Sequence, residues 1–381
     1  MNEDLESDIK QEETEEDLVT LVMKRYDRAT KAMLGFLREA DECRLYYRGD
    51  QWLIRTQSKW RVPEKDPWRV RLTINRLQPA VESIINVTLR SRPLIVCTPA
   101  SDEDTDRNSA KVTERVLRYY YDVQEMDEKM EQVVRWVCTS GNHFAMPRWD
   151  KNLGPKVEKP EVIEVPDPMT GQMVQQETGE IAETIPQGDM VLDLYSAFQV
   201  TPEPDATSIE DAAWFIVTEL LLRDKVEEMF DTELPDAVTD RTSELFDHPK
   251  HFAPVSLDGD TVETEDRILI YKMYEKPCKK HPEGRIVYTT KDKWLRTDPL
   301  PGGEYRIVHF RGIDLPGEFW ATSIVSTAIP AQTEYNKLRS QMIEDRRLMG
   351  RPKWTAPIGS IEEDTIDGKP GQIIFWDPVA A

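Results

Sequence analysis

The stretch from Phe319 to Trp354 constrains the fold most, because it reads as one long helix with a defined beginning and end. Pro330 is tolerated in a first helical turn, where a missing N–H costs nothing. Gly350 before Arg351-Pro352 is a typical helix stop. Between these points the helix spans about 19 residues, or about 28 Å. Its small or apolar residues recur at steps of three, four and seven, interrupted only by Asp345: Ala328, Ala331, Tyr335, Leu338, Met342 and Met349.

The other faces of this predicted helix are densely charged. They carry Glu334, Lys337, Arg339, Glu344, Arg346 and Arg347. A helix with one narrow apolar stripe suits packing beside neighbouring helices better than burial in a globular core. We therefore expect it to pack side by side with neighbours.

The composition limits the class of protein. The chain has 381 residues, with 71 acidic and 49 basic side chains and a formal charge of -22. This balance argues against a protein whose main task is to grip phosphate backbones, since that task needs clustered Lys and Arg. The length predicts two or three domains. The 10 Trp, 12 Tyr and 10 Phe indicate a folded chain rather than a disordered one.

The sequence contains few signals of where in or outside a cell the protein resides. No run of 18 apolar residues exists, so we expect no membrane span, and the N-terminus lacks the apolar segment of a signal peptide. Four cysteines without paired spacing predict free thiols in a reducing compartment: Cys43, Cys97, Cys138 and Cys278.

The order of periodic segments predicts an α+β fold, with helices first and sheet second. Residues 1–17 hold nine carboxylates and one lysine and are expected to form an acidic disordered tail. Apolar periodicity predicts helices at 18–48, 74–90 and 223–230, and two more within 102–140. On the first of these two we expect Ala110, Val116, Leu117 and Tyr120 to face inward.

Alternating residues predict the strands. These are a short strand at 92–99, strands at 190–195 and 213–220, and an antiparallel meander at 268–274, 285–290 and 305–311. Residues 151–190 are rich in Pro, Glu, Gln and Gly, and predict a β-ribbon or mobile insertion with its turn at 169–172.

Motifs of common catalytic sites are absent: the sequence has no G-x-x-x-x-G-K-[ST], G-x-G-x-x-G, G-x-S-x-G or H-E-x-x-H. One arrangement resembles a zinc site, with His248-x-x-His251 followed by Cys278-x-x-His281, because each pair can supply half of a tetrahedral site. The loop surroundings favour exposed histidines instead. We predict no enzyme activity, no metal and no cofactor. A metal-dependent nuclease stays open as an alternative.

A set of short motifs occurs in a fixed order along the chain. In the first half these are Arg71-Leu-Thr-Ile-Asn-Arg76, Val81-Glu-Ser-Ile-Ile85, Ser91-Arg-Pro-Leu-Ile-Val96, Pro99, Asp106 to Ala110, Thr139-Ser-Gly141 and Trp149-Asp150. In the second half they are Phe198-Gln-Val-Thr-Pro202, Asp205, Trp214, Ser323-Ile-Val, Pro330-Ala-Gln332, Glu334-Tyr-Asn336 and Gly350-Arg-Pro-Lys353. The ordered set resembles tailed-bacteriophage portal proteins of the podovirus P22-like type, from about Trp52 to the end. Thr201 departs from an Asp usual in the family, and Ala321 from a common glycine.

The resemblance implies a portal-type fold. It has a wing domain at 18–320, a long stem helix at 321–350, and the start of a clip at 351–381. Family members continue into a second stem helix, a tunnel loop and a crown, so we expect this chain to be a fragment of a longer protein. Copies of the chain would form a ring, normally of twelve, at one vertex of a phage head.

The resemblance also implies partners and a location. Double-stranded DNA would pass through the ring during packaging and ejection. The ring would contact the major capsid protein, the scaffolding protein, the packaging terminase and later the tail adaptor, with no membrane. It would reside in the virion, and in the host cytoplasm during assembly.

Candidate site residues follow from this assignment. The stem residues expected to face a neighbouring subunit or DNA are Gln332, Asn336, Lys337, Arg339, Arg346 and Arg347. The clip residues expected to face a partner are Arg351, Lys353 and Trp354. Two further alternatives stay open: another head–tail assembly protein, such as an adaptor or scaffold, and a cellular coiled-coil scaffold.

Overall fold

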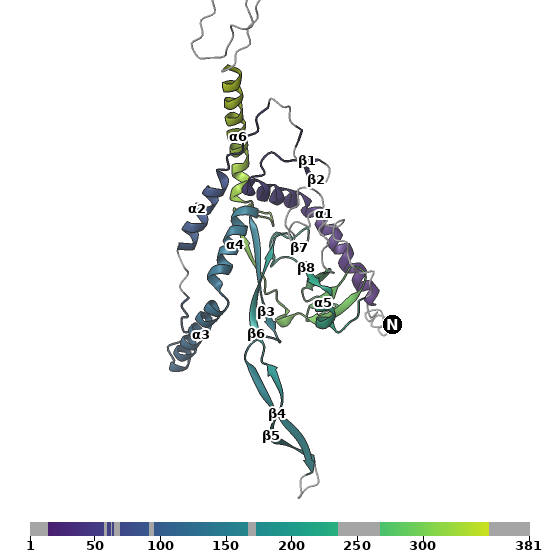
Figure 1. The fold of residues 1–381 in the computed structure, drawn as a ribbon. Coiled ribbons are helices and arrows are strands. Elements are labelled where there is room, and N and C mark those ends of the chain that lie inside the picture. Colours follow the sequence, from purple (N-terminus) through teal and green to yellow (C-terminus); the bar gives the residue numbers. More distant parts are fainter. Residues whose placement is uncertain are drawn as a thin grey trace, which may run out of the picture. The chain divides into compact units, whose positions relative to one another are not determined.

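The computed structural model describes residues 14–56, 59–61, 63–64, 69–90, 95–166, 173–234 and 267–349 (Figure 1). It contains both helices and antiparallel sheets, so the predicted α+β class is confirmed. The chain divides into two compact units. Unit 1 comprises residues 1–44 and 80–327, and unit 2 comprises residues 45–79 and 328–381. This division differs from the contiguous domain predicted at 18–320, because residues 45–79 group with the C-terminal part of the chain.

The largest sheet of unit 1 has five antiparallel strands in the order β11-β10-β9-β8-β7. Their bounds are β7 Val200–Pro202, β8 Trp214–Leu222, β9 Arg267–Glu275, β10 Arg285–Thr289 and β11 Trp294–Pro299. Helix α1 (Glu15–Arg48) packs on this sheet, since Leu18, Val22, Tyr26 and Ala29 share one core cluster with strand residues. Tyr26 meets Tyr271 of β9 edge-on at 4.9 Å between ring centroids. The spacing of four, four and three along α1 is what puts these side chains on one face.

The N-terminus of α1 is fixed by a reciprocal cap. The Asp17 N–H donates to Thr14 Oγ1 (3.3 Å), and the Thr14 N–H donates to Asp17 Oδ2 (3.3 Å). Glu15, Glu16 and Asp17 lie in the first turn, where the helix dipole favours carboxylates. Residues 15–17 are therefore helical and not part of a disordered tail. Residues 1–13 of the predicted tail lie outside the described residues.

A second sheet of unit 1 has the order β12-β3-β6, with β3 at Asn142–Asp150, β6 at Asp189–Ser196 and β12 at Val308–Arg311. Phe144 of β3 lies in a core cluster with Tyr195, Phe215 and Phe319. Residues 305–311 were expected to complete the meander after 285–290. That prediction was wrong: β11 takes the place beside β10, and β12 pairs with β3.

Three helices follow one another directly before β3: α2 (Leu77–Arg90), α3 (Asp104–Val123) and α4 (Met126–Ser140). The break between α3 and α4 falls at Glu125, whose φ of 50° is left-handed. No residue of α3 is fully buried. Of the four residues expected to face inward, Ala110 and Tyr120 are half-buried, whereas Val116 and Leu117 are exposed. The predicted strand at 92–99 is not formed at 95–99, and residues 91–94 lie outside the described residues.

The insertion at 151–190 contains a two-stranded ribbon, β4 (Lys156–Pro166) with β5 (Met173–Pro186), as Figure 1 shows. Two glycines with positive φ stand at its base, and a Cβ on Gly154 would lie 2.5 Å from the Gly188 carbonyl. The predicted turn at 169–172 falls on residues that are not described. Helix α5 (Arg223–Phe230) has the bounds predicted for it.

Unit 2 contains the short hairpin β1 (Ile54–Thr56) and β2 (Lys59–Arg61), together with parts of α1, α2 and α6 (Ile324–Met349). No helix among the described residues is long and apolar enough to cross a membrane.

Candidate functional site

Helix α6 contains all the stem residues predicted from the sequence. It spans Ile324–Met349, within the range 321–350 predicted for the stem helix, but Pro330 lies inside the helix and not in its first turn as expected. The start has a local cause, because Ser323 Oγ accepts a hydrogen bond from the Ser326 N–H (2.9 Å). This is the cap that serine commonly makes before a first helical turn.

The buried face of α6 in unit 2 is polar. Gln332, Asn336 and Ser340 are each about 4 % exposed or less and follow one another at steps of four. Residues four apart lie on the same side of a helix, one turn above each other. This polar row therefore faces the interior of unit 2, where apolar side chains are the usual occupants.

The polar row holds an extended segment, residues 70–76, by its backbone. The N–H groups of Leu72, Ile74 and Arg76 donate to Ser340 Oγ (3.0 Å), Asn336 Oδ1 (3.1 Å) and Gln332 Oε1 (3.1 Å). The Val70 N–H donates to Glu344 Oε1 (2.7 Å) in the same way. Two extended residues advance about 6.6 Å and four helical residues advance about 6 Å, so the two periods match. We call these four contacts the amide ladder.

Further side-chain amides brace the amide ladder. Gln332 Nε2 donates to Gln51 Oε1 (3.0 Å) and to the Ile74 carbonyl (2.8 Å). Asn336 Nδ2 also donates to Gln51 Oε1. Asn75 Oδ1 accepts from the Leu77 N–H (3.1 Å), which fixes the first turn of α2. Each buried amide thus has partners, as buried polar groups require.

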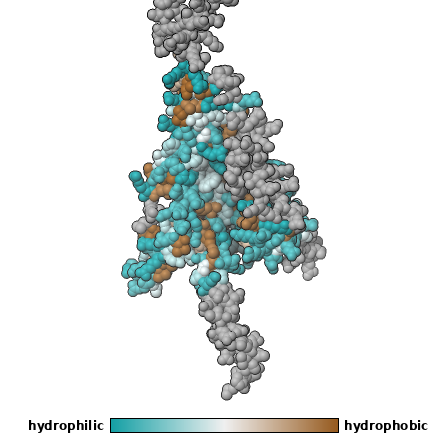
Figure 2. All heavy atoms as spheres, in the orientation of Figure 1, coloured by the Kyte–Doolittle hydropathy of each residue, from teal (hydrophilic) through white to brown (hydrophobic). Residues whose placement is uncertain are grey.

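The opposite face of α6 is apolar and exposed. Leu338, Met342 and Met349 are 57 %, 59 % and 82 % exposed, and Figure 2 shows hydrophobic surface over α6. Arg339 and Arg346 flank this stripe on one side, and Glu334 and Asp345 flank it on the other, as the helical spacing dictates. All four charged residues are exposed. Such a stripe between opposite charges resembles one face of a coiled coil.

The structure separates the predicted site residues into three groups. Gln332 and Asn336 were expected to face a neighbouring subunit or DNA. Instead they are buried in the amide ladder, where their side-chain amides have hydrogen-bond partners within the chain. The four cationic residues are exposed: Lys337, Arg339, Arg346 and Arg347. The three clip residues lie outside the described residues: Arg351, Lys353 and Trp354.

Sequence reasoning missed Ser340, Glu344, Gln51 and Asn75 as parts of the ladder. The signal was present, because Gln332, Asn336, Ser340 and Glu344 recur every four residues.

The turn before α6 is built around Asn142 of β3 in unit 1. The Asn142 side chain donates from Nδ2 to the Ala321 carbonyl (2.7 Å), and its Oδ1 accepts from the Ala321 N–H (3.1 Å). Gly141 lies against this turn, since a Cβ there would stand 2.4 Å from the Ala321 carbonyl oxygen. His309 Nε2 lies 3.0 Å from the same Asn142 Oδ1. Burial lowers the pKa of His309 to about 3, with a smaller contribution from Arg311, so its ring is neutral at pH 7.

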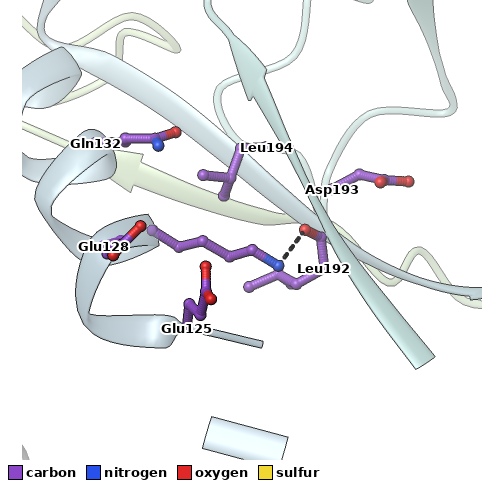
Figure 3. A pocket seen from close by; sticks show the side chains of 7 residues that line it. Glu125, Glu128, Gln132, Leu192, Asp193 and Leu194 are labelled. Atoms are coloured by element: carbon purple, nitrogen blue, oxygen red, sulfur yellow. Dashed lines mark hydrogen bonds between the residues drawn. The ribbon is translucent and has the colours of Figure 1, made fainter. Parts of the chain in front are cut away.

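A small pocket of unit 1 is lined by Glu125, Glu128, Lys129, Gln132, Leu192, Asp193 and Leu194 (Figure 3). Lys129 crosses it and donates to the Leu192 carbonyl (3.2 Å) and to Gln124 Oε1 (2.8 Å). The hydrogen bond from Lys129 to Leu192 thus connects α4 to β6 across the pocket.

Of the zinc arrangement suggested by the sequence, the pair Cys278 and His281 lies within the described residues. The Cys278 N–H donates to the His281 carbonyl (2.9 Å), which closes a tight turn. His248 and His251 lie outside the described residues. Within the part of the chain that is described, no group of three or more His, Cys, Asp or Glu is placed to hold a metal ion.

Residues 23–168 match the family model of the phage P22-like portal protein. This match supports assigning the chain to the P22-like portal family. It covers most of α1, the helices α2 to α4, β3 and β4, and confirms the resemblance for the motifs from Arg71 to Asp150. The motifs from Phe198 onward lie beyond the matched residues. Helix α6 lies beyond the matched residues. No curated protein matches the chain.

Proposed function

We propose that this chain is the subunit of a portal ring, a channel at one vertex of a phage head through which double-stranded DNA is packaged and ejected. The match of residues 23–168 to the P22-like portal family carries this proposal. The family indicates a structural role in phage particles and no catalytic one. In this proposal most of unit 1 is the wing and α6 is the stem helix.

The exposed face of α6 supports assembly into a ring. A stripe of Leu338, Met342 and Met349 has no cover within the described residues. Repeated head-to-tail, such a stripe is buried between adjacent copies, and a rotation that closes gives a ring. Burying a Leu or Met side chain contributes about 1.5–3 kcal/mol each. Opposite charges on the two flanks suit identical parallel neighbours, because the basic flank of one helix meets the acidic flank of the next.

The amide ladder supports a stiff channel wall. It binds α6 to residues 70–76 through four backbone N–H groups, so this segment packs along one face of the helix as a second layer. The ladder occupies one face of α6 and leaves the apolar stripe and the charged flanks for neighbouring copies.

The charge of the chain suits passage of DNA. With 71 acidic and 49 basic residues, copies of this chain repel phosphate on average and do not clamp it. Lys337, Arg339, Arg346 and Arg347 would pair with neighbouring subunits or graze the DNA backbone. Arg351, Lys353 and Trp354 would lie in the clip that meets the packaging terminase and later the tail adaptor. The capsid and scaffolding proteins would contact the ring at the vertex, after assembly in the host cytoplasm.

Native mass by light scattering, with negative-stain images of the same sample, tests the proposal. We expect particles of about a dozen subunits with an axial hole. The full-length gene product is measured in the same way. A complete product that stays monomeric at all concentrations would overturn the proposed function.

A further inference from the structure

The β4–β5 ribbon continues from β3 and β6 as a long arm (Figure 1). Its strands pair with each other from Lys156↔Pro186 to Pro166↔Met173, and neither of them pairs with another described strand. The 11 residues of β4 make the arm about 36 Å long. The direction of the arm is therefore set at its base, where it joins β3 and β6.

The base of the arm is a joint, because strand pairing is interrupted there. The β3–β6 ladder ends and the β4–β5 ladder begins at two pairs, Asp150↔Asp189 and Lys156↔Pro186. Between these pairs, residues 151–155 stand on one side and residues 187–188 on the other, and we call these two segments the joint. A hydrogen bond connects its two sides, from the Gln187 N–H to the Pro155 carbonyl (3.0 Å). An unequal number of residues interrupts a ladder and bends the strands, so the arm is not a rigid extension of the sheet.

Two glycines lie in contact within the joint. Gly154 and Gly188 have φ values of 89° and 86°, in the left-handed region that favours glycine. A Cβ on Gly154 would lie 2.5 Å from the Gly188 carbonyl oxygen, so the two backbones approach as closely as only glycine permits. Hinges are made of a few residues that absorb a change in φ and ψ, and glycine absorbs such a change at the lowest steric cost.

The sheet side of the joint is held by an arginine. Arg148 of β3 donates from Nε to Asp193 Oδ2 (2.7 Å) and from Nη1 to Asp150 Oδ2 (2.9 Å). The first contact joins β3 to β6, and the second holds the last residue of β3. A turn at the joint would therefore move the arm and leave the end of the β3–β6 sheet in place.

The indole ring of Trp149 packs on the joint. A Cβ on Gly188 would lie 2.5 to 2.8 Å from the ring atoms Nε1, Cε2 and Cζ2, so the ring lies directly against the Gly188 backbone. Trp149 belongs to β3, opposite Met190 of β6, and is 59 % exposed. A Trp ring is large and rigid, and contact with it removes apolar surface from water. The ring thus connects the sheet to the backbone of the joint.

We propose that the arm turns about Gly154 and Gly188, and that the Trp149 ring holds it in one direction. A turn of about 20° would move the far end of the arm by about 12 Å, given its length. A small change at Gly188 would thus become a large movement at the far end. This inference goes beyond the proposed function and does not depend on the ring.

Time-resolved fluorescence anisotropy of a label on the arm tests the proposal, because it reports nanosecond motion. The label is attached to Gln175→Cys on β5, in the full chain with Cys97 and Cys278 replaced by serine. The other two cysteines, Cys43 and Cys138, are buried.

The first pair of variants removes an aromatic ring. We expect Trp149→Ala to lower the residual anisotropy of the label, which remains after its nanosecond motion, at least twofold. Tyr119→Ala is the matched control, because it removes a ring of similar exposure, 60 %, from α3. It should leave the residual anisotropy unchanged.

The second pair keeps the ring of Trp149 and adds a methyl group at a glycine. Gly188 and Gly317 have similar positive φ values, 86° and 83°, so alanine brings similar backbone strain at both. The new Cβ must displace the Trp149 ring at Gly188, whereas at Gly317 no atom lies within 4 Å of it. We expect the residual anisotropy to fall in Gly188→Ala and to stay at the parent value in Gly317→Ala.

Hydrogen exchange of the β4 and β5 amides checks that the ribbon stays paired in each variant. An unchanged residual anisotropy in Trp149→Ala would overturn the proposal. Faster exchange throughout β4 and β5 in that variant would also overturn it, because the ring would then stabilise the ribbon and not hold its direction. The label reports motion of the arm alone, so a chain that does not assemble into a ring contradicts the proposed function and leaves this inference in place.

Discussion

Glu275 is a buried carboxylate of unit 1 that contacts two arginines. It is buried on β9, where it accepts from Arg25 Nη1 (2.8 Å) and Arg285 Nε (2.7 Å). Removing one member of a buried ion network leaves uncompensated charge, which costs about 3–5 kcal/mol. We expect Glu275→Gln to lower the free energy of unfolding by about 3 kcal/mol, measured by urea denaturation at pH 7. Glu228→Gln, at an exposed site on α5, is the control and should change it by less than about 0.5 kcal/mol.

The same carboxylate predicts a pH dependence. Burial raises the pKa of Glu275, but the charges and hydrogen bonds of Arg25 and Arg285 outweigh burial and leave the pKa below its usual value. A lowered folded pKa contributes stability above the unfolded pKa of about 4.3, and this stability is lost as the pH falls through the folded pKa. The difference between the parent chain and Glu275→Gln should be constant from about pH 5 to 8 and shrink below about pH 4. A difference that is unchanged at pH 3 would contradict the role of these two arginines.

His143 predicts a second pH effect of a different kind. It lies on β3 and is 3 % exposed, and its ring stacks with that of Trp136 at 6.1 Å between centroids. Neither ring nitrogen has a hydrogen-bond partner among the described residues. Burial lowers its pKa to about 4. In the unfolded chain the ring takes a proton below about pH 6.5, so stability is lost progressively as the pH falls from about 6.5 to 4.

The variant His143→Phe isolates this effect, because Phe keeps a ring for stacking and cannot be protonated. We expect it to be at least as stable as the parent at pH 7, and to lose less stability between pH 6.5 and 4.5 in thermal unfolding. The remaining pH dependence includes His309, whose pKa is also lowered by burial. An identical loss in both proteins would show that His143 is not neutral in the fold.

At the scale of secondary structure, the amide ladder is the feature most open to test. Asn336 Oδ1 accepts from the Ile74 N–H (3.1 Å) and from Gln332 Nε2 (3.0 Å). Asn336→Leu leaves the Ile74 N–H without its acceptor, at about 1–3 kcal/mol for an unsatisfied group, whereas Gln332 Nε2 keeps Gln51 Oε1 and the Ile74 carbonyl as acceptors. We expect a loss of about 1–3 kcal/mol and at least tenfold faster hydrogen exchange at the Ile74 amide.

Lys337→Leu is the matched control for this variant. It places the same side chain one residue further along α6, at an exposed position. Its unfolding free energy should stay within about 0.5 kcal/mol of the parent, and exchange at Ile74 should not change. Equal effects of the two substitutions would mean that residues 70–76 are held by something other than the ladder.

The sequence predicted those elements whose signals are local. The bounds of α5 and the end of α6 follow from apolar spacing, capping residues and stops within a few positions. Pro330 does not mark the first turn of α6, because the cap at Ser323 starts the helix six residues before it. A proline inside a helix removes one backbone hydrogen bond, and the helix tolerates it at a cost in free energy.

Elements whose place depends on distant partners were not predictable in the same way. The alternation in 305–311 marks a strand, but alternation does not say which strand it joins, and β12 pairs with β3 about 165 residues away. The role of Gln332 and Asn336 was missed for a related reason. Apolar periodicity finds faces that avoid water, whereas this face is buried through hydrogen bonds to a distant segment of backbone.

At the scale of the whole molecule, two apolar stripes are exposed among the described residues. They are Leu338, Met342 and Met349 on α6, and Val112, Val116, Tyr119 and Val123 on α3. A formal charge of -22 keeps copies of the chain apart through electrostatic repulsion. Two uncovered apolar stripes act in the other direction, because they favour association. Each stripe has charged residues beside it, which select among partners where apolar contact alone would not. The uncovered stripe on α6 is a surface that the proposed ring would bury.

The flanks of α6 give the last prediction. Glu334 and Arg339 are five residues apart on either side of the stripe. This is the spacing at which residues of neighbouring parallel helices pair across an apolar seam. We expect Arg339→Glu to raise the dissociation concentration of the ring about tenfold at low salt, because it faces Glu334 of the adjacent copy with a like charge. The double change Glu334→Arg with Arg339→Glu restores opposite charges at every interface, so its assembly should return to within about threefold of the parent by light scattering. If Arg339→Glu rings keep their mass and instead package less DNA, Arg339 faces the channel, and the stem helices of adjacent copies pair through other residues.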